Sequence, residues 1–292
     1  MHMAVPTIRI APSVDMPLLG LGTGPPYTAN DTYISVLTAV RMGYTAIDTA
    51  HNYRNQPAIA RAIAAAGVQR KDIFITSKVP GSLSHEETLA TADQSLKELE
   101  TNYIDLLLVH FPCPSQPYNE SAGSKTLRQV QWRAMEVLVH TGRARAIGVS
   151  HHCQRHMEDI LEIATVPIAA NQVEYHVGMA GGADAQNWMQ GKGINLLSFL
   201  PLCGQCDDRS TLISGPLVSS IGRAHNRTGA QVSLRWLVQS GVPAIPRSKS
   251  QQHLMQNMQL FDFSLTRDEM AMLNDATHPP AADGPEDDCK IP

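Results

Sequence analysis

Residues 104–110 read IDLLLVH, a run in which apolar residues follow one another instead of alternating with polar ones. A strand with one face in water alternates, whereas a strand of a parallel sheet is covered on both faces and does not. The runs at 72–78 (DIFITSK), 144–149 and 194–199 have the same character. These runs therefore predict a parallel sheet whose two faces are both buried.

A helical segment follows each expected strand. Ser84 with Glu87 and Thr266 with Glu269 have the spacing of capping boxes, which begin helices. Strands are expected at 18–21, 45–48, 72–78, 104–110, 144–149, 168–173, 194–199 and 242–245. Helices are expected at 31–43, 56–66, 84–100, 125–141, 153–164, 183–192, 216–227, 229–240, 250–258 and 266–274. Eight strand–helix units with two extra helices fit a closed (β/α)8 barrel, the TIM barrel fold, which takes about 250 residues.

A doubly wound sheet is the alternative fold, and it requires a glycine-rich phosphate loop that leads directly into a helix. The candidate loop, GLGTG at 20–24, is followed by Pro25 and Pro26, so no helix begins there. We therefore predict one (β/α)8 domain over residues 1–292, with an N-terminal β-hairpin and a loop-like tail at 278–292.

The composition limits the classes of partner. Apolar residues make up 43% of the 292 residues, which excludes a disordered chain. The net charge of −4 provides no basic surplus for nucleic acid. The longest apolar runs are far shorter than the roughly 20 residues that span a bilayer, and the first residues do not resemble a secretion signal. We expect a cytoplasmic monomer or weak dimer with no nucleic-acid or membrane partner.

Polar side chains end three successive expected strands. Asp48, Lys78 and His110 are 30 and 32 positions apart, one strand–helix unit each. In barrel enzymes the chemistry takes place at the carboxyl ends of the strands, so these side chains should meet at the barrel mouth. Tyr53 follows Asp48 by five residues and can fold back over the same mouth. One such residue alone is more often structural, but three successive strand ends favour a catalytic site.

The chemistry of this set points to a carbonyl group. Lys78 beside Asp48 is expected to lower the pKa of Tyr53, which then serves as a general acid near neutral pH. A nitrogen of His110 can donate a hydrogen bond to the oxygen of a substrate. No serine or cysteine nucleophile belongs to the set, and a hydride from a nicotinamide would complete the reaction.

The sequence resembles the aldo-keto reductase superfamily along nearly its whole length. Six ordered blocks carry the resemblance: GYTAIDTAHNY (43–53), ITSKV (75–79), IDLLLVHFP (104–112), GRARAIGVS (142–150), NQVEYH (171–176) and IPRS (245–248) followed by Gln256 and Asn257. The resemblance implies a barrel fold and NAD(P)H-dependent reduction of carbonyl compounds. It also implies that Asp48, Tyr53, Lys78 and His110 have the roles given above.

The resemblance further implies a cofactor site. Ser150 and Gln172 match positions that hold the nicotinamide carboxamide, and Phe199 replaces an aromatic residue that stacks on the nicotinamide ring. Residues 245–257 match the block that holds the adenosine 2′-phosphate and the adenine. The residues expected to contact the cofactor are Ser150, His151, Gln172, Phe199, Leu200, Leu202, Arg247, Ser248, Lys249, His253, Gln256 and Asn257. The basic side chains among them indicate NADP(H), with NAD(H) as the alternative.

Three positions depart from the family pattern. His151 replaces a usual Asn that grips the carboxamide, and His253 replaces a usual Arg beside the 2′-phosphate. Gly24 stands where many members carry a Trp that lines the substrate pocket, so Tyr27 is expected to supply that wall. The residues expected to contact the small-molecule carbonyl substrate are Tyr27, His110 and Phe111.

Cysteine and histidine clusters leave alternatives open. Cys203 and Cys206 form a C-x-x-C motif, which we interpret as two free thiols, with a redox-sensitive pair or a metal site as alternatives. The segment 151–156 contains three histidines and Cys153, which also suggests a metal. Hydride transfer needs no metal ion, so we predict none.

Two other functions remain as alternatives. The first is a cofactor-binding regulatory subunit of the same fold with slow turnover, against which the complete catalytic set argues. The second is a metal-dependent barrel hydrolase. That class needs His and Asp ligands at several strand ends, where this sequence has Lys78 and Tyr53.

Overall fold

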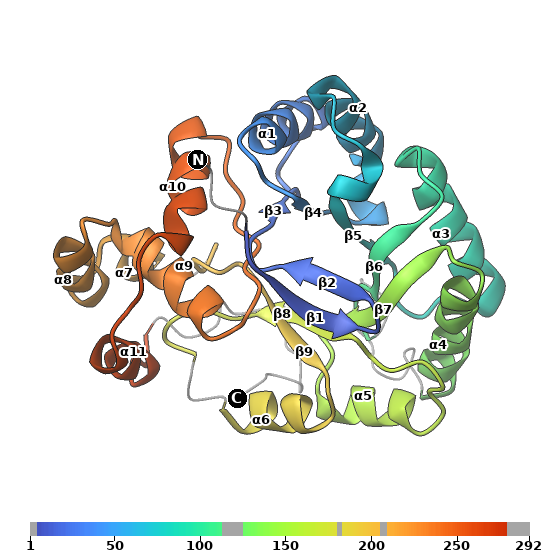
Figure 1. Cartoon of the computed structure of the whole chain (residues 1–292). Helices are drawn as coiled ribbons and strands as arrows, with labels where there is room; N and C mark the ends of the chain where they lie inside the picture. The colour runs from blue at the N-terminus through green and yellow to red at the C-terminus, as the bar shows by residue number, and fades with distance from the viewer. Residues whose placement is uncertain (1–4, 113–124, 180–182, 205–208, 279–292) are drawn as a thin grey trace.

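Parallel strands form the barrel wall in the computed structural model, which describes residues 5–112, 125–179, 183–204 and 209–278. In the described residues, seven strands pair in sequence order, and they curve around the centre inside an outer ring of helices (Figure 1). The strands are β3 (Leu21–Gly22), β4 (Ala46–Asp48), β5 (Phe74–Val79), β6 (Ile104–Val109), β7 (Ala144–Ser150), β8 (Ala170–Glu174) and β9 (Asn195–Phe199).

The barrel closes at residues 242–245, where we expected an eighth strand. Ala244 forms isolated parallel bridges with Leu19 on one side and with β9 on the other. Pro243 and Pro246 have no N–H to donate, so the hydrogen-bond ladder is limited to single bridges. The expected strand is therefore reduced to these bridges, but the predicted (β/α)8 barrel is confirmed.

A β-hairpin fills one end of the barrel, as predicted. It consists of β1 (Thr7–Ala11) and β2 (Val14–Pro17), which are antiparallel and cross the centre of the view in Figure 1. Met16 of the hairpin belongs to the same buried cluster as Leu106 of β6. Arg145, near the start of β7, donates a hydrogen bond to the Ser13 oxygen in the hairpin turn at 2.9 Å. The hairpin thus covers the amino ends of the strands, which leaves their carboxyl ends for the site.

Helices cover the outside of the barrel. They are α1 (Ala29–Arg41), α2 (Gln56–Ala66), α3 (His85–Glu98), α4 (Lys125–His140), α5 (Gln154–Leu161), α6 (Ala183–Gly191), α7 (Arg209–Ser214), α8 (Pro216–His225), α9 (Gly229–Gln239), α10 (Gln251–Met258) and α11 (Arg267–Asn274). The capping boxes predicted at Ser84 and Thr266 are confirmed. Helix α1 begins earlier than expected, because Thr28 and Asp31 form a further capping box. Helix α7 was not expected.

The main apolar core lies between the strands and this layer of helices. It includes Trp132 of α4, Ile147 of β7 and Trp236 of α9, all of which are buried. Burial of such large apolar side chains is the main source of stability in a fold of this size. Within the described ranges, no helix is long and apolar enough to cross a bilayer.

The close contact between β7 and β8 at Gly148 gives a test of the fold. A Cβ atom at this position would run into the Ala170 oxygen and would lie 2.9 Å from Cδ2 of Leu108. We expect Gly148→Ala to lower the free energy of unfolding by about 1–3 kcal/mol, measured by urea denaturation. Gly191→Ala is the matched control, because a Cβ at Gly191 meets nothing within 4 Å. Equal stability of the two variants would contradict the strand packing described here.

Candidate active site

The structure brings the four predicted catalytic side chains to the carboxyl ends of neighbouring strands. Asp48 is the last residue of β4, Lys78 is the penultimate residue of β5, and His110 directly follows β6. Tyr53 lies on η1 (His51–Tyr53), a short 3-10 helix in the loop after β4. Asp48, Lys78 and His110 are buried, and Tyr53 is partly buried. The spacing argument therefore placed these residues correctly, whatever their roles.

A buried ion pair lies at the centre of the site. Nζ of Lys78 is 2.6 Å from Oδ1 of Asp48. It also donates a hydrogen bond to the main-chain oxygen of Thr49 at 3.0 Å. The second carboxylate oxygen of Asp48 accepts a hydrogen bond from Nε2 of Gln172 at 2.8 Å. An ammonium that is 1% exposed requires this neutralisation, since an unpaired buried charge costs several kcal/mol. The pair thus ties β4, β5 and β8 together.

The hydroxyl of Tyr53 is held in its protonated form. Nζ of Lys78 lies 5.1 Å from the centre of the Tyr53 ring. Burial raises the pKa of Tyr53 above its usual value, and the positive charge of Lys78 offsets only part of that effect. The expectation of a lowered pKa is therefore wrong in direction for this structure, because the removal of water from the phenol outweighs the nearby cation.

His110 is a neutral imidazole. Burial lowers its pKa to about 2, and the nearby Lys78 and His151 add to the effect. Its ring meets the Tyr53 ring edge to face, with 5.6 Å between the ring centres. A neutral imidazole carries one N–H, which is the donor that a substrate oxygen beside Tyr53 requires.

A continuous row of rings extends from His110 across the barrel mouth. His110 stacks on Phe111 at 4.5 Å between ring centres, Phe111 lies 4.9 Å from His151, and His151 lies 4.7 Å from Phe199. These rings come from the ends of β6, β7 and β9. The row joins two predicted substrate residues, His110 and Phe111, to two predicted cofactor residues, His151 and Phe199.

The other residues predicted to hold the nicotinamide lie on the same strand ends. The Ser150 hydroxyl donates to the main-chain oxygen of Gln172 at 3.0 Å, which joins β7 to β8. The backbone of both His151 and Leu200 is left-handed, with φ of 57° and 48°. Non-glycine residues adopt this conformation at a cost, and such residues gather at functional sites. Leu202 follows in the same partly buried loop.

The residues predicted to bind the adenosine phosphate lie at the start of α10. Arg247 and Lys249 are exposed, and Ser250 caps the helix by accepting a hydrogen bond from the His253 N–H at 3.3 Å. Lys249 also contacts Asp31 at 2.8 Å. Basic side chains beside a helix N-terminus are suited to bind an anion. The remaining members of this predicted set, Ser248, Gln256 and Asn257, are partly or fully buried in the same segment.

The ring of Tyr27 lies beside two basic side chains. Its ring lies 5.4 Å from both the Arg247 guanidinium and the Lys249 ammonium group. The residue that adjoins Tyr53 is instead Gly24, where a Cβ atom would lie 3.3 Å from Cζ and 3.4 Å from Oη of Tyr53. The described contacts of Tyr27 are thus with the basic segment, and its substrate role remains a prediction.

A buried polar network around Asn55 was missed by the sequence analysis. Nδ2 of Asn55 donates to the Thr23 oxygen, and the Thr49 hydroxyl donates to Oδ1 of Asn55, both at 2.8 Å. The Thr23 hydroxyl donates a hydrogen bond to the main-chain oxygen of Asp48 at 2.8 Å. These bonds hold the loop that carries Tyr53 against the loop after β3. The position of Asn55 directly before a helix was the available signal, but it predicts a cap and not these contacts.

The cysteines differ from expectation. Cys203 and Cys153 are both disulfide-bonded, so the interpretation of Cys203 as a free thiol is wrong. Cys206, the other half of the C-x-x-C motif, lies outside the described residues. Cys153 also lies near a histidine of the 151–156 segment, with Sγ 3.4 Å from Nδ1 of His156.

The comparisons with known proteins identify the family. The model of the aldo/keto reductase family matches residues 18–278. The chain belongs to the aldo/keto reductase family. It is 34% identical to the glyoxal reductase of Bacillus subtilis over 283 residues, which cover 97% of this chain and 96% of that protein. It is 33% identical to the morphine 6-dehydrogenase of Pseudomonas putida, over 92% and 90% of the two chains.

Solved structures of this family have the same fold. The aldose reductase of Schistosoma japonicum superposes with a TM-score of 0.80 at 30% identity, covering 90% of this chain and 89% of that one. An aldo-keto reductase of Bombyx mori, solved in complex with NADP, gives 0.83 at 28% identity over 93% and 92%. The family is one of oxidoreductases that use nicotinamide cofactors. Family membership therefore argues against the alternative of a metal-dependent hydrolase. These relatives are enzymes, and they give no support to the alternative of a regulatory subunit.

Three buried histidines and the half-buried His151 make the folded protein sensitive to acid. Burial lowers the pKa of His110 to about 2, of His152 to about 3, and of both His151 and His156 to about 4. Below pH 6.5, the unfolded chain therefore binds protons that the folded chain excludes, and stability is lost as the pH falls toward 4.

We expect the urea midpoint of unfolding to fall between pH 7 and pH 5, before most carboxylates titrate. One pKa unit corresponds to about 1.4 kcal/mol of unfolding free energy. His152 alone can therefore lower the unfolding free energy by on the order of a few kcal/mol as the pH falls from 6.5 to about 3. His152→Asn should reduce the dependence of unfolding free energy on pH. A midpoint that stays constant from pH 7 to pH 5 would contradict neutral buried histidines.

Proposed function

We propose that this protein reduces an aldehyde or ketone to an alcohol with NAD(P)H, and that Tyr53 is the general acid. The observation that carries the proposal is the contact of Lys78 with both Asp48 and the Tyr53 ring beside a neutral His110. The nicotinamide cofactor, when bound, supplies the hydride. The remaining task of the protein is to place a carbonyl group and to deliver one proton to its oxygen.

Each residue of the site has a separate part in that task. The Tyr53 hydroxyl, which like any phenol is protonated at neutral pH and whose pKa burial raises further, gives its proton to the carbonyl oxygen. Lys78 stabilises the negative charge that then develops on the Tyr53 oxygen. The N–H of His110 orients the carbonyl oxygen toward Tyr53. Asp48 and Gln172 are positioning residues, because they hold the Lys78 ammonium group at this place.

The chain has groups suited to a nicotinamide dinucleotide phosphate. The Phe199 ring ends β9 beside the His151 ring, and the exposed Arg247 and Lys249 lie at the N-terminus of α10. Phe199 would contact the nicotinamide, and the two basic residues would contact the 2′-phosphate. The basic pair favours NADP(H) over NAD(H), since an additional phosphate dianion is best recognised by cationic donors.

The substrate is proposed to be a small carbonyl compound bound beside Tyr53 and Gly24. Gly24 lies directly against the Tyr53 ring, where a Cβ would be 3.3 Å from Cζ, and the His110 ring, which stacks on Phe111, meets the Tyr53 ring edge to face. We also propose that the chain forms one domain and that the protein is a cytoplasmic monomer or weak dimer.

The role of Tyr53 is tested by Tyr53→Phe. We expect kcat for aldehyde reduction to fall by about 10²–10⁴-fold, because the proton donor is lost. The affinity for NADPH, measured by quenching of protein fluorescence, should stay nearly unchanged. Tyr33→Phe is the matched control, since Tyr33 lies on α1 with its ring 5.8 Å from Arg61. Full turnover in Tyr53→Phe would refute the mechanism.

The choice of cofactor is tested by Arg247→Met. We expect KM for NADPH to rise about tenfold, the equivalent of one lost charged contact, while KM for NADH changes little. Steady-state rates with a panel of aldehydes and both cofactors measure the effect. Lys71→Met serves as a control for the loss of an exposed positive charge away from the mouth. An equal rise for both cofactors would show that Arg247 does not read the 2′-phosphate.

A further inference from the structure

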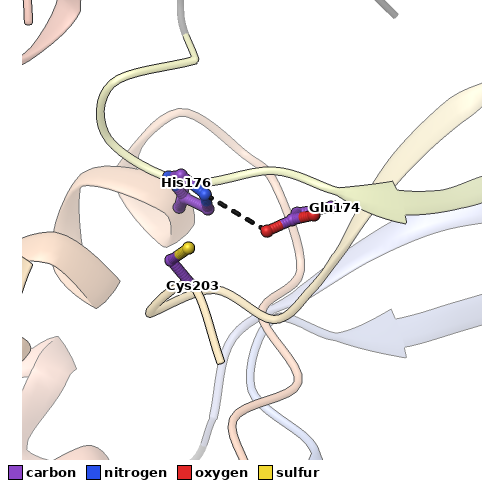
Figure 2. Close-up of side chains that lie close together, drawn as sticks. All are labelled: Glu174, His176 and Cys203. Atoms are coloured by element: carbon purple, nitrogen blue, oxygen red, sulfur yellow. Dashed lines mark ion pairs between the residues drawn. The ribbon is translucent and has the colours of Figure 1, made fainter. Parts of the chain in front are cut away.

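Three potential metal ligands meet beside the site described above. Glu174 ends β8, His176 follows in the next loop, and Cys203 lies in the loop after β9. The two loops leave the sheet side by side, because Glu174 and Phe199 are register partners in β8 and β9. Figure 2 shows the three side chains directed toward one another. Their ligand atoms all lie within 4.8 Å of each other, the one such group of three found among the described residues.

The imidazole of His176 points a buried lone pair into this group. Its Nδ1 contacts the Val177 oxygen at 2.8 Å, and a carbonyl oxygen accepts, so Nδ1 carries the proton. Nε2 is therefore the nitrogen left to face Glu174 and Cys203. The side chain is 0% exposed, and Nε2 has no hydrogen-bond partner. A histidine that donates from one nitrogen to a main-chain oxygen and offers the other is oriented as metal ligands are.

The Glu174 carboxylate is too far from His176 for an ordinary hydrogen-bonded pair. Nε2 of His176 and Oε1 of Glu174 are 3.4 Å apart, as the dashed line in Figure 2 marks. The same kind of pair elsewhere in this chain is closer, since Nε2 of His225 lies 2.9 Å from both oxygens of Glu269. The wider separation leaves room for an ion between the two groups.

The separations suit Zn²⁺. Tetrahedral zinc with bonds of about 2.0–2.1 Å to nitrogen and oxygen holds those two atoms about 3.4 Å apart. A zinc–sulfur bond of about 2.3 Å places the sulfur about 3.6 Å from either atom, so Cys203 needs to move by about 1 Å at most. One sulfur, one imidazole and one carboxylate are all ligands that zinc accepts.

Cys203 becomes a ligand after its disulfide is reduced. A dithiol reductant supplies two electrons and two protons, becomes a disulfide itself, and converts the S–S bond of Cys203 into two thiols. Zinc then displaces the proton of the Cys203 thiol, because the thiolate is the form that binds metal. An ion held in this way would leave when the disulfide re-forms, because a disulfide sulfur is no longer a thiolate.

We propose that the reduced protein binds one Zn²⁺ through Glu174, His176 and Cys203, with water as the fourth ligand. The site joins the loop after β8 to the loop after β9, next to Phe199. It is separate from the four catalytic residues and does not depend on the proposed reductase activity. It also differs from our expectation of a chain without metal.

The experiment counts metal bound to the full-length protein. Protein reduced with tris(2-carboxyethyl)phosphine is titrated with Zn²⁺ and, separately, with Co²⁺. We expect one ion per chain, with a thiolate-to-cobalt charge-transfer band in the near ultraviolet. Cys203→Ser should abolish the band, and both Cys203→Ser and His176→Asn should weaken binding by about 100-fold or more. Protein left oxidised should bind no stoichiometric metal.

Two control variants match the ligands. Cys153→Ser removes another disulfide-bonded cysteine that lies beside a histidine, and His225→Asn removes the histidine of a second histidine–glutamate pair. Both should bind metal as the parent protein does. The proposal is overturned if the reduced parent binds no metal, if oxidised protein binds equally, or if Cys203→Ser keeps the band. Loss of the charge-transfer band in Cys153→Ser would also overturn the proposal. If His176→Asn fails to fold, the Cys203→Ser arm decides.

Discussion

The buried ion pair of Lys78 with Asp48 is the interaction on which the rest of the site depends. An ammonium ion at this depth is stable only when its charge is balanced and its protons are bonded, and Asp48 and the Thr49 oxygen supply both. Asp48 in turn accepts from Gln172, so the balance extends to a strand on the other side of the mouth. Loss of either Asp48 or Lys78 would leave a buried charge unpaired, and loss of Gln172 would leave a carboxylate oxygen of Asp48 without this hydrogen bond.

Burial also determines the electrostatic character of the groups around this pair. It lowers the pKa of His110 and His151, which are therefore neutral at physiological pH, and it raises the pKa of Tyr53 further above that range. The positive charge of Lys78 therefore lies among neutral donors and rings, where water does not screen it. Such an environment stabilises the negative charge that develops on an oxygen beside Tyr53 in the transition state. It stabilises the neutral carbonyl group of the ground state less.

Most features that depend on neighbouring residues in the sequence were predicted correctly, whereas several features that depend on contacts between distant segments were not. Unbroken apolar runs identified the seven strands of the sheet, and capping boxes located helix starts at Ser84 and Thr266. The eighth strand failed because the flanking prolines cannot extend a ladder. Nothing in the sequence indicated that the Tyr27 ring lies near Arg247 and Lys249, and its substrate role stays a prediction. The disulfide at Cys203 was also not expected from so few cysteines.

The sequence by itself determined which chemical groups end which strands, since one strand–helix unit has a nearly constant length and parallel strands end at one edge. That was enough to predict the barrel and to bring Asp48, Lys78, His110 and Tyr53 together. The tertiary structure alone decided the direction of the pKa shift of Tyr53, the bond from Gln172 to Asp48, and the meeting of Glu174, His176 and Cys203. These features depend on the exclusion of water and on distances between loops of different strands, and residue spacing along a chain specifies neither.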